Sequence, residues 1–400
     1  MTLLDARMSP TTFRATMALA VAFVMLATTG WTAVRPGGPA DARTVAVRAW
    51  LRATIGGHRL PDPDTAPAGA VARLFASLTR PQALRLTRRY SLVVGNLNGV
   101  PLALRYQANR FSLLKARADE RTRASGNTLT PAGRKEAGRR AQRYTSLLAG
   151  HRQILAFDPS GAGRAAEVFG DLAAATRVAV VVPGVDTNIL SFERATKAYA
   201  APVGMARALY RHERAAQHAA RTAVIAWADY VTPSGVGLDA STANLAEHGA
   251  TRLLALLGAL PRRQRVSLFC HSYGSVLCGI AAPGLAKGQV ADIAVFGSPG
   301  MHAKRASQLH TDANVWAARD SGDWIEDVPH LEFAGLGHGT DPVSEKFGAR
   351  VVSAAGAAGH PGYFAPGTAS LRNFTDIALG AYAAVTCGGA AGSACTAGLA

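Results

Sequence analysis

The spacing of apolar and polar positions changes near residue 150 and divides the chain into two parts. Between residues 66 and 150, apolar positions recur at helical spacing, for example over residues 70–75 and 102–111. Pro101 and Pro131 each follow turn-forming residues and suit the first position of a helix. The pattern therefore predicts a mainly helical segment over residues 66–150.

From residue 151 onward, short apolar runs alternate with longer stretches at helical spacing. The run at residues 178–182 is apolar throughout, which indicates a strand that is buried on both faces of a parallel sheet. We therefore expect residues 151–400 to form an α/β fold with a doubly wound, mostly parallel sheet, whose ligands bind at the carboxyl ends of the strands. The candidate strands are residues 153–158, 177–183, 222–228, 266–270, 292–296, 314–318 and 349–353, and helices are expected at residues 192–217 and 242–260.

The first residues have the composition of an export signal. Arg7 and Arg14 precede an apolar run at residues 15–26, which has the proportions of a secretory signal peptide. The weakly polar stretch continues to residue 34, so an uncleaved membrane anchor is the alternative over residues 1–34. In both cases we expect a protein that is secreted or anchored on the outer face of the cytoplasmic membrane. Residues 35–65 are expected to form a linker with little structure apart from one helical patch at residues 45–51.

Positive charge is concentrated in the first part of the chain. The formal net charge is +17, and residues 1–150 hold 23 Lys and Arg against 7 Asp and Glu. Residues 151–400 hold 20 and 19, so the expected catalytic part is nearly neutral. A basic segment of this kind favours contact with an anionic membrane or cell-wall surface, and the alternative is a solvated helical face. Nucleic acid is not expected as a partner, because the chain has no binding motif for it.

A serine stands at the end of one predicted strand. The strand at residues 266–270 is followed by His271-Ser272-Tyr273-Gly274 and then by a segment of helical character. A sharp strand-to-helix turn exposes a serine hydroxyl as a nucleophile, and its neighbours must be small. Gly274 meets this need on one side, whereas Cys270 replaces the usual glycine on the other. We expect Ser272 to be the nucleophile of a G-x-S-x-G-like elbow.

A serine nucleophile needs a histidine base and an acid that orients it, and in this fold order both follow the serine along the chain. Asp323 lies on a glycine turn after the strand at residues 314–318 and is the first candidate for the acid; Asp320 and Asp327 are the alternatives. His360 lies on a Gly-flanked loop after the last strand and is the first candidate for the base. His338 is its competitor, and His271 is expected to point away from the cleft.

Two backbone N–H groups are expected to stabilise the oxyanion of acyl transfer. One belongs to Tyr273, which follows the nucleophile, and the other to Val185, next to Gly184 in the loop after the strand at residues 177–183. No HExxH and no zinc-type pairing of cysteines occurs, so neither a metal nor a cofactor is expected. The GxG of residues 161–163 lacks the rest of a dinucleotide motif and is expected to form a turn.

The four cysteines form two pairs in sequence. Cys387 and Cys395 bracket a Gly-rich loop, and a bridge between them would contribute about 2.5 kcal/mol by the chain-entropy relation. Cys270 and Cys278 flank Ser272 and are expected to be buried free thiols.

Several of these stretches together resemble the α/β-hydrolase superfamily, and more narrowly a bacterial family catalogued as a domain of unknown function. This resemblance implies a hydrolase with a Ser272, Asp323 and His360 triad and implies no particular substrate. We expect an exported serine hydrolase that cleaves a carboxylic ester, or a thioester or amide, of a small or lipid-like acyl substrate. The alternative is a non-catalytic binding or scaffold protein at the cell envelope. The stretches are residues 94–101, 155–164, 182–185, 271–275, 296–300, 347–350 and 359–360.

Overall fold

The computed structural model describes residues 41–328, 332–333, 336–388 and 395–399. The predicted signal peptide or anchor at residues 1–34 lies outside the described residues. Among the helices that are described, none combines the length and the apolar character needed to cross a membrane.

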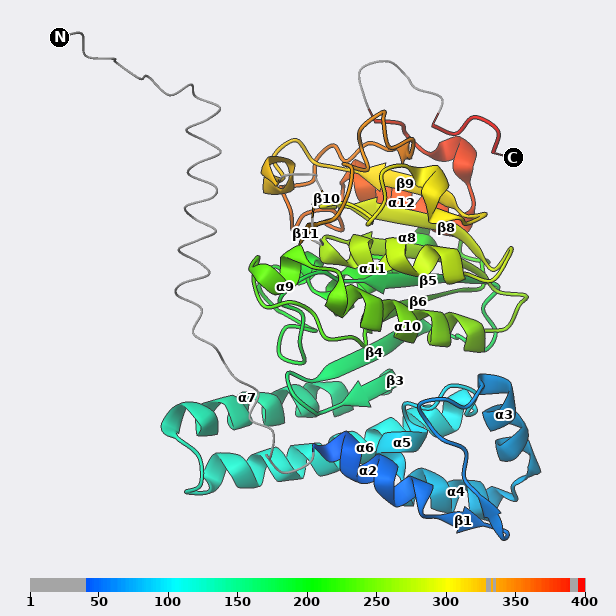
Figure 1. Ribbon diagram of the computed structural model, residues 1–400, viewed down its shortest axis with the longest axis vertical. Coiled ribbons are helices and arrows are strands. Elements are labelled where there is room, and N and C mark those ends of the chain that lie inside the picture. Colours follow the sequence, from blue (N-terminus) through cyan, green and yellow to red (C-terminus); the bar gives the residue numbers. More distant parts are fainter. Residues whose placement is uncertain (1–40, 329–331, 334–335, 389–394, 400) are drawn as a thin grey trace, which may run out of the picture.

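A single eight-stranded sheet forms the centre of the second part of the chain, which confirms the expected α/β class (Figure 1). Its order is β12-β9-β8-β7-β5-β6-β4-β3, and β12, β9, β8, β7, β5 and β6 run parallel. The strand β4 was not expected; it pairs antiparallel with β3 and β6. The strands are β3 (Gln153–Asp158), β4 (Arg164–Gly170), β5 (Arg177–Val182), β6 (Thr222–Ala228), β7 (Arg265–His271), β8 (Val290–Phe296), β9 (Asn314–Ala318) and β12 (Arg350–Val351).

Helices cover both faces of this sheet. On one face, α10 (Asn244–Ala259) and α11 (Tyr273–Ala281) pack on alternate strand residues that include Val180 and Leu268. On the other, α8 (Pro202–Ala216) and α12 (Ala369–Leu379) pack on the intervening residues, such as Val181 and Phe269. Burial on both faces explains why these strands are apolar throughout.

The first part of the chain is helical, as expected, and covers the β3 edge of the sheet (Figure 1). Side chains of this segment satisfy backbone groups of β3: Arg105 donates to the Leu155 carbonyl at 2.9 Å, and Asn109 donates to the Ile154 carbonyl at 2.9 Å. The unpaired side of an edge strand is thereby protected from pairing with another chain. The helices are α2 (Ala42–Leu51), α3 (Ala68–Ser77), α4 (Arg80–Arg89), α5 (Ser91–Val94), α6 (Leu102–Ser125) and α7 (Pro131–Leu148).

In the described part of residues 35–65, the helical patch expected at residues 45–51 lies within α2, but the expectation of little structure in the rest is wrong. Residues 41–65 contain α2 and a hairpin of β1 (Thr54–Ile55) and β2 (His58–Arg59). Trp50 is fully buried, its ring packs edge-on against Tyr90 at 5.5 Å, and its Nε1 donates to the Pro61 carbonyl. A buried tryptophan with a satisfied N–H stabilises this stretch against the helical segment.

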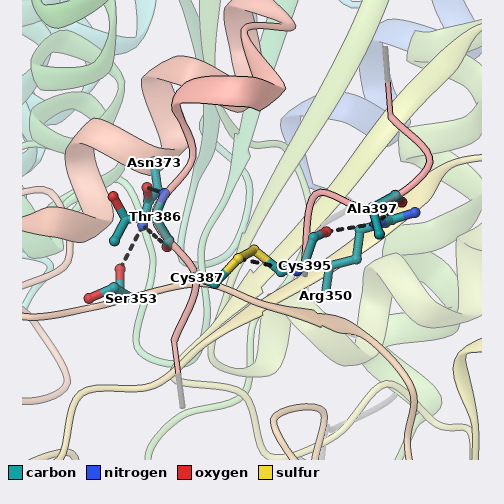
Figure 2. Close-up of a disulfide and its surroundings, with 7 residues drawn as sticks. All are labelled: Arg350, Ser353, Asn373, Thr386, Cys387, Cys395 and Ala397. Atoms are coloured by element: carbon teal, nitrogen blue, oxygen red, sulfur yellow. Dashed lines mark hydrogen bonds between the residues drawn. A yellow bond between two sulfur atoms is a disulfide. The ribbon is translucent and has the colours of Figure 1, made fainter. Parts of the chain in front are cut away.

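A disulfide between Cys387 and Cys395 holds the end of the chain beside β12 (Figure 2). Arg350 of β12 donates to the Cys395 carbonyl at 2.6 Å and to the Ala397 carbonyl at 3.0 Å. Asn373 of α12 donates to the Thr386 carbonyl at 3.0 Å, just before the bridge. The bridge and these hydrogen bonds therefore attach the described part of the C-terminal segment to both β12 and α12.

Candidate active site

Ser272 occupies a sharp turn between β7 and α11. Its backbone has φ 54° and ψ −127°, a conformation that non-glycine residues rarely adopt and that often marks a functional site. Its N–H donates to the Phe296 carbonyl of β8 at 3.0 Å. A side chain at Gly274 would place a Cβ 2.6 Å from the Val182 carbonyl oxygen, so the turn requires glycine there. The sharp strand–turn–helix geometry predicted around Ser272 is therefore present.

Cys270 and Cys278 form a disulfide across this elbow, so the expectation of two free thiols is wrong. Helix α11 runs back along the end of β7 and brings the two Cα atoms to 6.5 Å, within the range of a disulfide. Both residues are fully buried. The cysteine that replaces the usual glycine thus links the strand before Ser272 to the helix after it.

Asp323 and His360 lie in direct contact. His360 Nδ1 is 2.8 Å from Asp323 Oδ1 and 3.1 Å from Oδ2. Asp323 stands at the N-terminal end of the 3₁₀ helix η4 (Trp324–Asp327) and accepts a hydrogen bond from the Ile325 N–H. Tyr363 donates a further hydrogen bond to Oδ2 at 2.6 Å.

These donors keep the Asp323 carboxylate ionised. Burial alone raises the pKa of Asp323, but the hydrogen bonds from His360, Tyr363 and the Ile325 N–H outweigh burial and bring its pKa below the ordinary value. An ionised carboxylate that accepts from Nδ1 holds the imidazole in the tautomer whose Nε2 can accept a proton.

The end of β8 lies between the elbow and the acid–histidine pair. Phe296 of this strand accepts the Ser272 N–H, and the next residue, Gly297, has φ 53°. A Cβ at Gly297 would lie 2.9 Å from Asp323 Oδ2 and 3.0 Å from His360 Nδ1. Within the described chain, Ser272 Oγ and His360 make no direct hydrogen bond. Such bonds are often long in free enzymes and shorten when substrate binds.

His271 contacts His360 rather than simply pointing away from the site. Its Nε2 lies 3.0 Å from the His360 carbonyl oxygen, and the two rings are 4.5 Å apart. Burial, followed by the neighbouring His360, lowers the pKa of His271 to about 3, so its ring is neutral near pH 7. A neutral His271 with its proton on Nε2 positions the His360 loop by donating to this carbonyl.

Among the described residues, no hydrogen bond joins either alternative acid, or the competing histidine, to the ring of His360. Asp320 Oδ2 accepts from the N–H groups of Gly322 and Gly359, at 3.1 and 2.9 Å, and so connects the acid turn to the loop of His360. Asp327 is exposed at the end of η4. The Nε2 of His338 lies 2.6 Å from the Ala240 carbonyl oxygen, and its ring packs edge-on against Tyr273.

The two N–H groups expected to stabilise an oxyanion flank Ser272. A Cβ at Gly184 would lie 2.6 Å from Ser272 Cβ and 3.0 Å from Oγ, so the loop that carries Val185 passes directly against the serine. Among the described residues, the N–H of neither Val185 nor Tyr273 donates to a protein acceptor. An oxyanion site needs backbone donors of this kind, without a protein acceptor. The described residues also contain no group of three or more His, Cys, Asp or Glu side chains able to hold a metal ion.

Comparison with known proteins gives a family match over the middle of the chain. Residues 158–333 match the family model described as "Alpha/beta hydrolase". The curated relatives include "Uncharacterized protein MT2140" and "Uncharacterized protein Rv2079" from two strains of Mycobacterium tuberculosis, each 28% identical over 391 residues. The match covers 80% of this chain and 57% of these relatives, so the chain spans little more than half of their length.

Among solved structures, the chain is similar to 2,6-dihydroxy-pseudo-oxynicotine hydrolase, with 11% identity, a TM-score of 0.35, and coverage of 78% of this chain and 88% of that one. It is also similar to XC6422 from Xanthomonas campestris, with 13% identity, a TM-score of 0.30, and coverage of 57% and 90%. The matched region contains the elbow, the Val185 loop and Asp323. Residues 158–333 thus match the α/β-hydrolase family, and the mostly parallel eight-stranded sheet agrees with this fold. Both observations support a hydrolase.

Proposed function

We propose that the protein is a serine hydrolase that cleaves a carboxylic ester, or a thioester or amide, through an acyl-enzyme intermediate. The observation that carries this proposal is the 2.8 Å contact of Asp323 with His360 beside an elbow that holds Ser272 at positive φ. An activated nucleophile needs this combination of a hydroxyl held on a sharp turn, a base and a group that orients the base.

In the first half of the reaction, Ser272 Oγ attacks the carbonyl carbon while His360 Nε2 takes the hydroxyl proton. The negative charge moves to the carbonyl oxygen, where the N–H groups of Val185 and Tyr273 stabilise it. Each such donor commonly accounts for about 10²–10³ in rate. Collapse of the intermediate breaks the bond to the leaving group, which receives the proton from His360 and departs as an alcohol, thiol or amine.

In the second half, water replaces the leaving group. His360 takes a proton from water, whose oxygen attacks the acyl carbon, and the proton then returns to Ser272 Oγ as the acid is released. Asp323 stays ionised throughout and stabilises the imidazolium that forms in each half. The hydrogen bonds from Tyr363 and Ile325 to Asp323 support this role, because they favour its charged form.

Turnover by the Ser272→Ala variant tests this proposal. We expect hydrolysis of p-nitrophenyl acetate to fall by at least about 10³-fold, while the circular dichroism spectrum and thermal unfolding stay those of the parent protein. The matched control is Ser321→Ala, because Ser321 is exposed on the loop that carries Asp323. A folded Ser272→Ala protein with parental turnover would contradict the proposal.

We also propose that the protein works outside the cytoplasm, either secreted or anchored on the outer face of the membrane. Both cysteine pairs of the chain form disulfides, Cys270–Cys278 and Cys387–Cys395. Disulfides persist in oxidising compartments and are rare in the cytosol, which supports export. The apolar run at residues 15–26 would serve as the export signal.

An anionic membrane or cell-wall surface is the partner that we propose for the helical segment. Arg85, Arg88 and Arg89 follow one another at helical spacing on α4, and all three are exposed. Within the described chain, no acidic side chain forms an ion pair with them. Unpaired arginines on one face attract an anionic surface with an affinity that falls as salt rises.

A further inference from the structure

Four large apolar side chains are exposed on loops at the carboxyl edge of the sheet. We call these side chains the apolar rim; their exposed fractions are 53% for Val231, 61% for Val236, 45% for Trp324 and 46% for Leu336. Single exposed apolar residues are ordinary on protein surfaces. These four differ because hydrogen bonds and ring contacts connect their loops to residues in or next to the candidate active site.

Trp324 lies beside His360, the proposed base. It follows Asp323 directly in sequence, and its ring centroid lies 4.7 Å from that of His360. Nearly half of the side chain is nevertheless exposed. An indole ring next to the catalytic imidazole offers an apolar surface to whatever occupies the site.

Val231 and Val236 lie on a loop that is hydrogen-bonded to the loop of Val185, one of the two proposed oxyanion donors. Their loop follows β6 and is bonded to the loop of Val185: the Asp186 N–H donates to the Pro233 carbonyl at 2.9 Å. In return, the Gly235 N–H donates to Asp186 Oδ1 at 2.8 Å. These hydrogen bonds fix the valine loop next to the residue that follows Val185.

Leu336 is connected to Tyr273, the residue after Ser272, through His338. It begins β11 (Leu336–Gly337), which pairs with β10 (Glu332–Phe333) and leads directly into His338. The His338 ring packs on the Tyr273 ring at 5.6 Å, and its Nε2 contacts the Ala240 carbonyl of α9 (Leu238–Ser241). Figure 1 shows β10 and β11 beside α9 at one end of the sheet.

We infer that the apolar rim binds a hydrocarbon group of the substrate, so that the site selects esters that carry a long apolar acyl or alkyl chain. This inference rests on the proposed serine hydrolase function and adds the substrate class to it. A hydrocarbon chain laid across these side chains would remove apolar surface from water, which stabilises the complex in proportion to the area covered. A strongly polar substrate would gain nothing from the same four side chains.

A preference for long over short esters, which we call the chain-length preference, measures this binding. Two series of ester substrates distinguish the acyl side of the ester from the alkyl side. The acyl series compares p-nitrophenyl acetate with p-nitrophenyl decanoate, and the alkyl series compares methyl acetate with octyl acetate, all below their aggregation concentrations. The full-length protein should favour the long member of one series by on the order of tenfold or more in kcat/KM. The series that shows the preference tells which side of the ester the rim contacts.

The chain offers a well-matched pair of variants. Val236→Ser with Leu336→Ser removes two rim side chains, whereas Val45→Ser with Leu51→Ser removes the same residue types at 55% and 44% exposure on α2. The rim variant should lose most of the chain-length preference through a higher KM for the long ester, and the α2 variant should keep it. Trp324→Ala should also lose most of the chain-length preference, and Trp324→Phe should retain part of it.

The outcomes separate the two proposals. If the parent protein hydrolyses the short esters through Ser272 but shows no chain-length preference, the rim inference is overturned and the hydrolase proposal stands. A preference that survives in both the rim variant and Trp324→Ala also overturns the inference. If the parent protein hydrolyses none of the esters and Ser272 does not react with a serine-directed probe, both proposals fail.

Discussion

The Tyr363 hydroxyl donates a 2.6 Å hydrogen bond to Oδ2 of Asp323, whose Oδ1 lies 2.8 Å from Nδ1 of His360. The same hydroxyl accepts the Asp320 N–H at 3.1 Å, so its proton is directed at Asp323. Burial, together with the hydrogen bond to Asp323, raises the pKa of Tyr363 well above its usual value. Tyr363 therefore remains a donor and fixes the rotation of the carboxylate that orients the base.

Replacing Tyr363 with Phe should slow turnover without removing the triad. Loss of one hydrogen bond to a charged group costs about 1–2 kcal/mol, so kcat should fall by roughly 5- to 30-fold. Tyr382→Phe is the matched control, because Tyr382 donates to Asp292 Oδ2 at 3.0 Å in another part of the molecule. Steady-state kinetics with p-nitrophenyl acetate should show the lower kcat for Tyr363→Phe alone; equal kcat values for the two variants would contradict this role.

The disulfide across the elbow should stabilise the fold and the position of Ser272 together. Exchange of Cys270 and Cys278 for Ala should lower the free energy of unfolding by about 2.5 kcal/mol, from the chain entropy of a short loop. It should also slow the reaction of Ser272 with a fluorophosphonate. Urea unfolding and labelling rates measure both effects. Alkylation of both cysteines in denaturant without reductant would show that the bridge is absent and contradict this account.

A buried acid far from the triad should make stability depend on pH. Glu213 of α8 is 1% exposed, and burial raises its pKa to about 8. Unfolded Glu has a pKa of about 4.3, so between these values the folded protein holds a proton that the unfolded chain releases. Stability should therefore fall as pH rises through this range, by up to about 1.4 kcal/mol per pH unit.

Glu213→Gln should remove this slope, because the amide does not titrate. Urea unfolding at pH 5, 6, 7 and 8 should show the variant gaining stability over the parent protein as pH rises. Glu247→Gln, at an exposed position of α10, is the control and should follow the parent curve. Parallel curves for Glu213→Gln and the parent would contradict the raised pKa.

The arginines of α4 should control binding to an anionic surface. The triple variant Arg85→Ser, Arg88→Ser and Arg89→Ser should sediment less with vesicles that contain anionic lipid. Binding of the parent protein should weaken as the salt concentration rises from about 50 to about 500 mM, because salt screens the attraction between exposed charges. A second triple variant has the same change in charge on exposed residues of the other domain: Arg262→Ser, Arg263→Ser and Arg265→Ser. Equal loss in the two variants would indicate a general charge effect and contradict a specific face on α4.

The sequence predicted the sheet well where strands are buried on both faces. The strands at residues 153–158, 222–228 and 314–318 have the bounds that their apolar runs predict. The strand β4 was missed because Arg164–Gly170 mixes Arg, Glu and small residues and has no continuous apolar run. The helix expected at residues 192–217 begins only at Pro202, because the side chains of Asn188 and Ser191 hold the preceding loop in turns.

The contact between Asp323 and His360 could be predicted because chain order decides which loops meet. Parallel strands bring the residues after β7, β9 and β12 to one edge, and this topology explains why the structure brings Asp323 and His360 into contact. The supporting residues were missed because they depend on how loops fold back. Nothing in the spacing of Tyr363 predicts its bond to Asp323, and the spacing of Cys270 and Cys278 does not show that α11 returns along β7.

The most direct test of the central claim is to label the full-length protein with a fluorophosphonate probe and map the modified peptide. We predict a single modification on Ser272 that disappears in His360→Ala, because the hydroxyl needs the imidazole to become nucleophilic. His338→Ala should retain labelling, since His338 contacts the Ala240 carbonyl rather than Asp323. A folded protein in which Ser272 stays unmodified would contradict an activated nucleophile and favour a non-catalytic binding protein at the cell envelope.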